Sequence, residues 1–250
     1  MKFCVLIPCF NHVTTIGEVA RAARAHCPVV VVDDGSTRAF PPLDDCTLLR
    51  LEGNRGKAAA LRAGFAYAAQ AGFTHVITMD ADGQHFTDDL PRLMAAARAQ
   101  PRALALGQRD FRACGAPPAR RHANALAAWW FYLESGVRLT DTQCGFRCYP
   151  LALAQRLQTR AGRFAFELEF LVRAGWVETP LAAVPVRCVY HARQLRESRF
   201  RPVADLARIT LLTAGLGLQS CFVPRAWRAA WSLGKQTPWR AAFGLARRPA

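Results

Sequence analysis

The sequence predicts an α/β fold with a mostly parallel central sheet, and three observations support this prediction. Short apolar runs rich in β-branched residues alternate with longer stretches of helical character through the first 110 residues. Polar clusters follow several of these runs, as expected where parallel strands end. The chain has 250 residues, of which 52% are hydrophobic and 20% charged, so it can bury the full core of one domain.

The first half of the chain is expected to contain five buried strands. Residues 29–32 are four consecutive valines, a run typical of a parallel strand covered on both faces. The first run ends at Pro8 without a small-residue cleavage site, so we interpret it as a strand rather than a signal peptide. The strands are expected at residues 3–7, 29–32, 47–51, 75–79 and 103–107. Helices are expected between them at residues 14–25, 58–71 and 88–99, the first capped by Thr14 or Thr15.

The second half of the sequence is less regular. A helix within residues 115–138 is expected to lie beside the ligand crevice, and residues 141–150 are expected to form a polar loop. A helix is expected at residues 164–174 and a further strand at residues 184–190.

Four polar clusters, at residues 8–12, 33–36, 53–57 and 80–85, each come directly after a predicted strand. The carboxyl ends of parallel strands meet at one edge of a sheet, where ligands bind in this architecture. We therefore expect one crevice to gather all four clusters.

Asp80 and Asp82 are the central candidates for chemistry. Two carboxylates one residue apart at the end of a buried strand can hold Mg²⁺ or Mn²⁺, and Gln84 adds a neutral oxygen. Such a cation would neutralise a diphosphate as its bond breaks. A bare Asp-x-Asp is more often a turn that caps the next helix, but here the other polar clusters favour the metal site.

Two further clusters suit a nucleotide. Asp33 and Asp34 can accept hydrogen bonds from a base or a ribose, although an Asp-Gly-Ser turn is also common at strand ends. Gly56 and Lys57 open a predicted helix and can form an anion site, unless Lys57 is simply solvated. The spacing matches neither G-x-G-x-x-G nor G-x-x-x-x-G-K-[ST], and G-x-S-x-G is absent from the sequence.

The net charge of +15 comes almost entirely from arginine, because only Lys2, Lys57 and Lys235 are lysines. Arginine forms paired hydrogen bonds to phosphates, so nucleotides, phospholipids or nucleic acid are favoured partners. The sequence has no recognisable nucleic-acid-binding module or aromatic platform, so we expect no nucleic-acid partner. Nine cysteines without a C-x-x-C pair favour a reducing compartment.

The C-terminal part has the composition of a membrane-surface segment. Residues 209–223 carry no charge but are fewer than the roughly 20 needed to cross a bilayer. Arginines flank this stretch and Trp227, Trp231 and Trp239 follow it, which is typical of an interfacial helix. The alternative is a core-packing helix with a solvated basic tail. We expect a catalytic domain at residues 1–200 and a basic, apolar, membrane-associating extension at residues 201–250.

The sequence resembles the inverting GT-A glycosyltransferases of family 2, the group that contains dolichol-phosphate mannose synthases and bacterial polyprenyl-phosphate glycosyltransferases. The resemblance covers about residues 3–200 and follows ordered motifs. They are Val5-Leu6-Ile7-Pro8-Cys9-Phe10-Asn11, Val31-Val32-Asp33-Asp34-Gly35-Ser36, Asn54-Arg55-Gly56-Lys57, Asp80-Ala81-Asp82-Gly83-Gln84-His85, Gly107-Gln108-Arg109, Asp141-Thr142-Gln143-Cys144-Gly145-Phe146-Arg147 and Phe166-Glu167-Leu168-Glu169, with a looser match at residues 193–200.

The resemblance implies a GT-A, Rossmann-like sandwich and a role for each matching residue. Pro8, Phe10 and Asp34 would line the base pocket, Asp80 the ribose–metal region, and Asp82 and Gln84 would bind the metal. Arg109, Arg147 and Arg193 would face donor or acceptor phosphates. Asp141 would lie near the acceptor, on a wall supported by Glu167 and Glu169. The sequence departs from many relatives at Phe10 (Tyr), His12 (Glu), Cys144 (Ser) and Arg196 (Gly in mannose synthases).

The expected function is therefore metal-dependent transfer of a sugar, with inversion, from a UDP- or GDP-linked donor to a lipid-linked acceptor such as a polyprenyl phosphate. An anionic phosphate acceptor needs no strong base, whereas a hydroxyl acceptor on a lipid or glycan would need one, and Asp141 is the candidate. A nucleotidyltransferase or a catalytically inactive member of the same family would also fit part of this pattern. The expected location is the cytoplasmic face of a membrane, as a peripheral enzyme.

Overall fold

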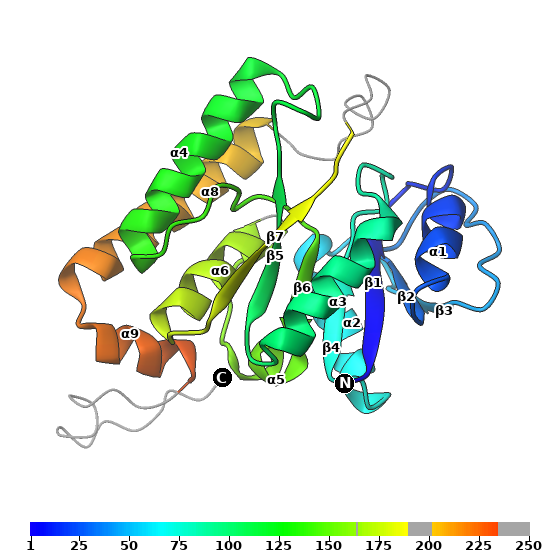
Figure 1. Cartoon of the computed structure of the whole chain (residues 1–250), viewed down its shortest axis with the longest axis horizontal. Helices are drawn as coiled ribbons and strands as arrows, with labels where there is room; N and C mark the ends of the chain where they lie inside the picture. The colour runs from blue at the N-terminus through cyan, green and yellow to red at the C-terminus, as the bar shows by residue number, and fades with distance from the viewer. Residues whose placement is uncertain (164, 190–201, 235–250) are drawn as a thin grey trace.

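The computed structural model describes residues 1–163, 165–189 and 202–234 of the chain (Figure 1). Arg193, Arg196, Lys235 and Trp239 lie outside these residues.

A seven-stranded sheet forms the centre of the molecule, in the order β3-β2-β1-β4-β6-β5-β7. All strands run parallel except β6, which is antiparallel to both of its neighbours. The strands are β1 (Phe3–Cys9), β2 (Val29–Asp33), β3 (Thr47–Arg50), β4 (His75–Thr78), β5 (Leu104–Arg109), β6 (Arg147–Pro150) and β7 (Leu181–Val186). The predicted α/β class with a mostly parallel sheet is confirmed.

Helices cover both faces of the sheet (Figure 1). The described helices are α1 (Ile16–Arg24), α2 (Lys57–Gln70), η1 (Thr87–Asp89), α3 (Leu90–Ala99), α4 (Pro118–Ser135), α5 (Leu151–Arg156), α6 (Ala165–Trp176), α8 (Pro202–Phe222) and α9 (Arg225–Ser232). Helices α1 and α3 pack on one face, and α2 and α6 on the other, where α4, α5 and α8 join the same core.

The alternation of side chains along the central strands explains the two cores. Val5 and Ile7 point to the face covered by α1 and α3, whereas Cys4 and Leu6 point to the face covered by α2. All four side chains are fully buried. A strand buried on both faces is therefore apolar at every position, which is why these runs could be found in the sequence.

Two expectations for the second half need correction. Residues 141–150 are not all loop, because β6 occupies Arg147–Pro150 between β4 and β5. A four-residue strand that begins with Arg and ends with Pro lacks the apolar run used to find the other strands. The last strand, β7, spans Leu181–Val186 and so begins three residues before the predicted 184–190. Helix α5 was not predicted.

The C-terminal helices pack on the body of the protein. Helix α8 lies against α4 and α6, and α9 lies against α6. Leu216 of α8 is buried in the same core as Phe131 and Trp176. The alternative that this helix packs on the core therefore holds for one side of α8. The boundary at residue 200, between a catalytic domain and a membrane-associating extension, stays a proposal. None of the helices in the described part of the chain is both long and apolar enough to span a bilayer.

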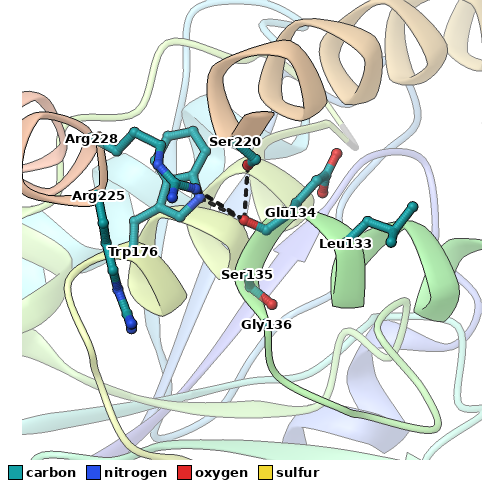
Figure 2. Close-up of a pocket in the computed structure, with 8 residues that line it drawn as sticks. All are labelled: Leu133, Glu134, Ser135, Gly136, Trp176, Ser220, Arg225 and Arg228. Carbon is teal, nitrogen blue, oxygen red and sulfur yellow. Dashed lines mark hydrogen bonds between the residues drawn. The ribbon is translucent and has the colours of Figure 1, made fainter. Parts of the chain in front are cut away.

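A cavity of about 230 Å³ lies where α4 ends and α9 begins, and is lined by residues of α4, α6, α8 and α9 (Figure 2). In this cavity the backbone carbonyl of Glu134 accepts hydrogen bonds from the Trp176 indole and the Ser220 hydroxyl, both at 2.8 Å. These bonds join α4 to α6 and α8. The cavity is distinct from the polar clusters at the carboxyl ends of the strands.

Candidate functional site

The polar clusters after the first strands meet at one edge of the sheet. Cys9 and Asp33 are register partners on β1 and β2, and the amide of Asp34 donates to the Cys9 carbonyl at 2.8 Å. Pro8 lies within β1, and Phe10 directly follows the strand. These positions bring Pro8, Phe10 and Asp34 to neighbouring strand ends, as predicted.

Asp34 holds the turn that leads into α2. Its two carboxylate oxygens accept hydrogen bonds from the backbone amides of Arg55 and Gly56, at 2.8 and 2.7 Å. Burial raises the pKa of Asp34, and the two amides oppose that rise. Gly35 allows this close approach, because a Cβ at this position would lie 2.5 Å from the backbone of Gly53.

Lys57 is the centre of a buried charge cluster. The Nζ atom lies 2.7 Å from Oδ1 of Asp80 and 2.9 Å from Oε2 of Glu167. The side chain is only 13% exposed, so the alternative of a solvated lysine is wrong. Burial acts to lower the pKa of Lys57, but Asp80 and Glu167 outweigh it and raise the pKa above its ordinary value. The second oxygen of Glu167 has no hydrogen-bond partner among the described groups.

Gly145 fits closely against this cluster. A Cβ at Gly145 would lie 2.7 Å from Oδ2 of Asp80 and 3.1 Å from Nζ of Lys57. The carbonyl of Gly145 accepts a 2.7 Å hydrogen bond from the hydroxyl of Thr78 on β4. The loop before β6 therefore packs directly on the end of β4, and any side chain at this position would displace the ion pair.

Asp80 and Asp82 begin a loop that α1 supports, since the Thr15 hydroxyl at its N-terminus donates to the Ala81 carbonyl at 2.6 Å. Burial acts to raise the pKa of Asp80, but Lys57, with His85 and Arg109, lowers it to about 2. Burial and the charge of Asp80 raise the pKa of Asp82 to about 6. The two carboxylates therefore repel each other, which is the environment that a bound cation relieves.

The donor set of this loop fits a hard divalent cation. Asp80, Asp82 and Gln84 offer oxygen atoms, which Mg²⁺ and Mn²⁺ prefer. Within the described residues, no group of three or more His, Cys, Asp or Glu side chains is arranged to hold a metal by itself. A cation held by Asp80, Asp82 and Gln84 would therefore take further ligands from substrate or water, as Mg²⁺ commonly does.

Arg109 and Asp141 form a paired salt bridge at the end of β5. The guanidinium donates from Nε to Oδ2 at 2.6 Å and from Nη2 to Oδ1 at 3.1 Å. Oδ1 also accepts the backbone amides of Gln143 and Cys144. Asp141 is 1% exposed and both of its oxygens are bonded, so it is not placed as a ready base. It instead orients Arg109 and the loop that follows.

The role predicted for Arg147 does not fit the structure. This residue is 1% exposed, and its guanidinium donates to the backbone carbonyls of Thr142, Cys144 and Glu167 at 2.7–2.8 Å. It therefore holds the loop before β6 against α6 and does not face a phosphate. Glu169 is similarly structural, because it bonds the amides of residues 160 and 161 and the Arg173 side chain. Arg193 lies outside the described residues.

Two side chains to which the sequence assigned no role belong to this site. Gln108 accepts from the backbone amides of Thr140 and Asp141 and donates to the Asp141 carbonyl, so it fixes that loop beside β5. His85 is 6% exposed, its Nδ1 has no partner in the described part of the chain, and burial lowers its pKa to about 4. Both lie within the motifs that carry the family resemblance, and that membership was the signal that could have found them.

Comparisons with known proteins agree with this geometry. Residues 4–157, more than half of the chain, match the family model described as glycosyl transferase family 2. The chain is 27% identical over 218 residues to an undecaprenyl-phosphate mannosyltransferase of Micrococcus luteus, covering 80% of this chain and 87% of that protein. It is 25% identical over 213 residues to a polyprenol monophosphomannose synthase of Mycolicibacterium smegmatis, covering 78% and 79%.

A solved structure shows the same fold. The glucosyl-3-phosphoglycerate synthase of Mycobacterium tuberculosis, crystallised with Mn²⁺, UDP and phosphoglyceric acid, aligns with a TM-score of 0.61 at 18% identity. The alignment covers 89% of this chain and 79% of that one. This structural alignment shows a GT-A fold, in agreement with the family match and the order of strands in the sheet. The chain belongs to glycosyl transferase family 2 and is a glycosyltransferase.

Proposed function

We propose that this enzyme transfers a sugar from a UDP- or GDP-linked donor to a polyprenyl phosphate, with inversion and with a divalent metal. The observation that carries the proposal is the charge cluster at the carboxyl edge of the sheet. There the buried cations Lys57 and Arg109 stand beside the Asp80–Asp82 loop, each held by carboxylates. Two fixed cations and a cation-binding loop suit a reaction in which both substrates carry phosphate.

The donor side of the proposal rests on β1, β2 and the Asp80–Asp82 loop. Pro8, Phe10 and Asp34 at neighbouring strand ends form the proposed base pocket. Asp80, Asp82 and Gln84 would hold the metal, which would supply charge neutralisation to the diphosphate. The solved relative with Mn²⁺ and UDP supports this use of the fold in general terms.

The proposal that the acceptor is a phosphate depends on whether the carboxylates of the site are free to take a proton. Asp80 and Glu167 are paired with Lys57, and Asp141 is paired with Arg109. A hydroxyl acceptor would need one of these groups, or Asp82, to take its proton, whereas a phosphate acceptor arrives already anionic. The undecaprenyl-phosphate and polyprenol relatives support the same choice. A hydroxyl acceptor remains the alternative.

In the proposed reaction an oxygen of the acceptor phosphate attacks the anomeric carbon from the face opposite the nucleotide. The bond to the donor diphosphate breaks, and the diphosphate leaves with the bonding electrons, so the configuration inverts. Arg109, oriented by Asp141, contacts a phosphate, and Lys57 stabilises charge next to Asp80. Arg193 keeps its predicted role at a phosphate. Because a polyprenyl phosphate resides in a bilayer, the enzyme works peripherally, on the cytoplasmic face of a membrane.

A donor and acceptor screen tests this proposal. Thermal shift with UDP-, GDP- and dTDP-linked sugars, with and without Mn²⁺, identifies the donor. Transfer of that labelled sugar is then measured to a polyprenyl phosphate and to the matching polyprenol. Transfer to the phosphate alone is the expected result. Transfer to the polyprenol alone would favour the hydroxyl alternative, and stabilisation by no donor would contradict the proposed site.

Asp82→Ala tests the metal-binding role. We expect turnover to fall by about 100-fold or more, because the cation that neutralises the leaving diphosphate loses a ligand. The melting temperature should change little, since Asp82 lies in a partly exposed loop. Asp88→Ala is the matched control, because its side chain is 75% exposed in the following turn. Metal-dependent turnover retained by Asp82→Ala would refute the assignment.

A further inference from the structure

Helix α4 presents an exposed apolar stripe to solvent. Leu126, Trp129, Trp130 and Leu133 are 57%, 52%, 38% and 49% exposed. Their spacing of three, four and seven residues places them on one side of the helix. Two tryptophans and two leucines side by side exceed the scattered apolar residues that are normal on a protein surface.

Helix α8 carries a matching stripe. Leu211, Leu218 and Phe222 are 75%, 61% and 80% exposed, and their spacing of seven and eleven residues also places them on one side. Helices α4 and α8 lie side by side, and a Cβ at Gly217 would lie 3.9 Å from the Trp130 ring (Figure 1). The two helices are therefore neighbours at Trp130, and we call the seven exposed residues of the two stripes the α4–α8 face.

The charges around the α4–α8 face are positive. Arg120 and Arg121 are exposed at the start of α4, whereas Arg225, exposed at the start of α9, is paired with the exposed Glu178 at 3.2 Å. Among the described side chains of α4, α8 and α9, Glu134 is the acidic one, and it is 1% exposed. Arginine at the margin of a Trp- and Leu-rich surface suits a layer with anionic headgroups and an apolar interior.

The α4–α8 face is linked to the acceptor side of the site. Asn124 of α4 is 3% exposed and donates a 2.7 Å hydrogen bond to the carbonyl of Thr140, next to Asp141. Leu126, the first residue of the face, follows two positions later. Helix α4, which carries part of the face, therefore also packs on the loop that contains Asp141, the partner of Arg109.

We propose that the α4–α8 face is the surface with which this protein lies on an anionic lipid bilayer, and that it brings the loop of residues 140–146, which contains Asp141, to the lipid. This inference rests on the proposed function, in which the acceptor is a lipid phosphate. A second copy of the chain fits less well, because each copy carries a net charge of +15 and the same arginines would face each other. An anionic bilayer complements both the apolar stripes and their basic margin.

Vesicle flotation of the full-length protein tests the proposal. The probe is a vesicle of phosphatidylcholine with phosphatidylglycerol, compared with phosphatidylcholine alone. We expect binding to the anionic vesicles that weakens as ionic strength rises above about 0.15 M. The variants Trp129→Ala/Leu133→Ala and Leu218→Ala/Phe222→Ala should each lower the partition coefficient by roughly tenfold, because each loses two large apolar side chains.

The matched control is Leu48→Ala on β3, which is 43% exposed and lies at the opposite edge of the sheet. It should float like the unchanged protein. Because Trp129 and Leu133 are only about half exposed, the melting temperature of every variant is measured, to separate a lost lipid contact from a lost fold. Equal flotation of the two double variants and the control would overturn the proposal. A dimer in the absence of vesicles that Trp129→Ala/Leu133→Ala dissociates, with no vesicle binding, would assign the face to a second copy instead.

Activity measured in parallel separates this inference from the proposed function. The double variants should transfer sugar normally to a short-chain prenyl phosphate in solution and poorly to a long-chain one in vesicles. Loss of flotation with equal activity on both acceptors would refute the link between the face and acceptor delivery. Absence of transfer to either acceptor by the unchanged protein, with flotation still dependent on the face, would refute the proposed function and leave the membrane contact standing.

Discussion

At the scale of single residues, Lys57 is the cation on which the site depends. It is the partner of Asp80 and of Glu167, which is 8% exposed. Lys57→Met should lower the free energy of unfolding by about 3 kcal/mol, because it leaves two carboxylates without their cation. Turnover should fall by about 100-fold, because a positive charge beside the Asp80–Asp82 loop is lost. Urea unfolding and steady-state kinetics measure the two effects.

The double variant Lys57→Met/Glu167→Gln is the control for this prediction. Removing the Glu167 charge should recover part of the lost stability without recovering turnover. If the double variant regained activity together with stability, Lys57 would be structural only.

Gly145 gives a second prediction at this scale. Its φ angle is not in the left-handed region, so the backbone accepts alanine, but the added Cβ would lie 2.7 Å from Asp80. We expect Gly145→Ala to fold and to lose about tenfold in kcat, because the Lys57–Asp80 pair must shift. Gly162→Ala is the matched control, because a Cβ there meets no atom within 4 Å. Equal kinetics for the two variants would show that the close contact does not matter.

The sequence was a good guide to which residues lie together at the site, and a poorer guide to the role of each residue. Asp34, Lys57 and Asp80 were found because they follow apolar runs, and the ends of parallel strands meet by topology alone. Whether an arginine faces a ligand or a carbonyl depends on contacts made across the fold. Arg147 illustrates this, because its carbonyl partners include Glu167, twenty residues away on another element.

At the scale of elements, the loop of residues 140–146 and strand β6 form one unit. Gln108 of β5 holds the start of this loop, and Arg147 holds its middle. The hydroxyl of Thr78 on β4 holds Gly145. Three side chains from neighbouring strands thus fix one backbone segment, which places Asp141 against Arg109 and Gly145 against Asp80.

The reversed direction of β6 explains why the sequence did not predict it. The other strands were found as apolar runs, or by their alternation with helices. A four-residue antiparallel strand inserted between β4 and β5 follows neither pattern, because its place in the sheet depends on pairing with residues about 40 and 70 positions earlier. The first five strands and the helices between them were predicted to within about two residues at each end, since both patterns are local to the sequence, whereas β6 and the short helix α5 were missed.

At the scale of the whole molecule, a buried acid lies where α4 meets α6, α8 and α9, whose side chains donate to its backbone carbonyl. Glu134 near the end of α4 is 1% exposed, and neither carboxylate oxygen has a hydrogen-bond partner among the described residues. In Figure 2 this carboxylate points away from Arg225 and Arg228. Burial raises its pKa from the ordinary value of 4.5 to about 8, so the native protein binds a proton here at neutral pH.

This raised pKa makes stability depend on pH in a defined direction. Between about pH 4.5 and 8 the unfolded chain has lost the proton that the native state keeps, so the stability due to protonated Glu134 is full below pH 4.5 and is lost as pH approaches 8. From about pH 5.5 to 8.5 this group alone should lower the free energy of unfolding by up to about 3 kcal/mol.

The variant Glu134→Gln tests this prediction. Its side chain stays uncharged, so it should lack this pH-dependent component of stability, while every other titrating group is the same in both proteins. Urea unfolding of both proteins at the two pH values measures the difference, with the exposed Glu178→Gln as the control that should behave like the unchanged protein. Parallel pH dependence in Glu134→Gln and the unchanged chain would show that Glu134 is not protonated in the native state, and that α4 and α8 pack around a charged carboxylate.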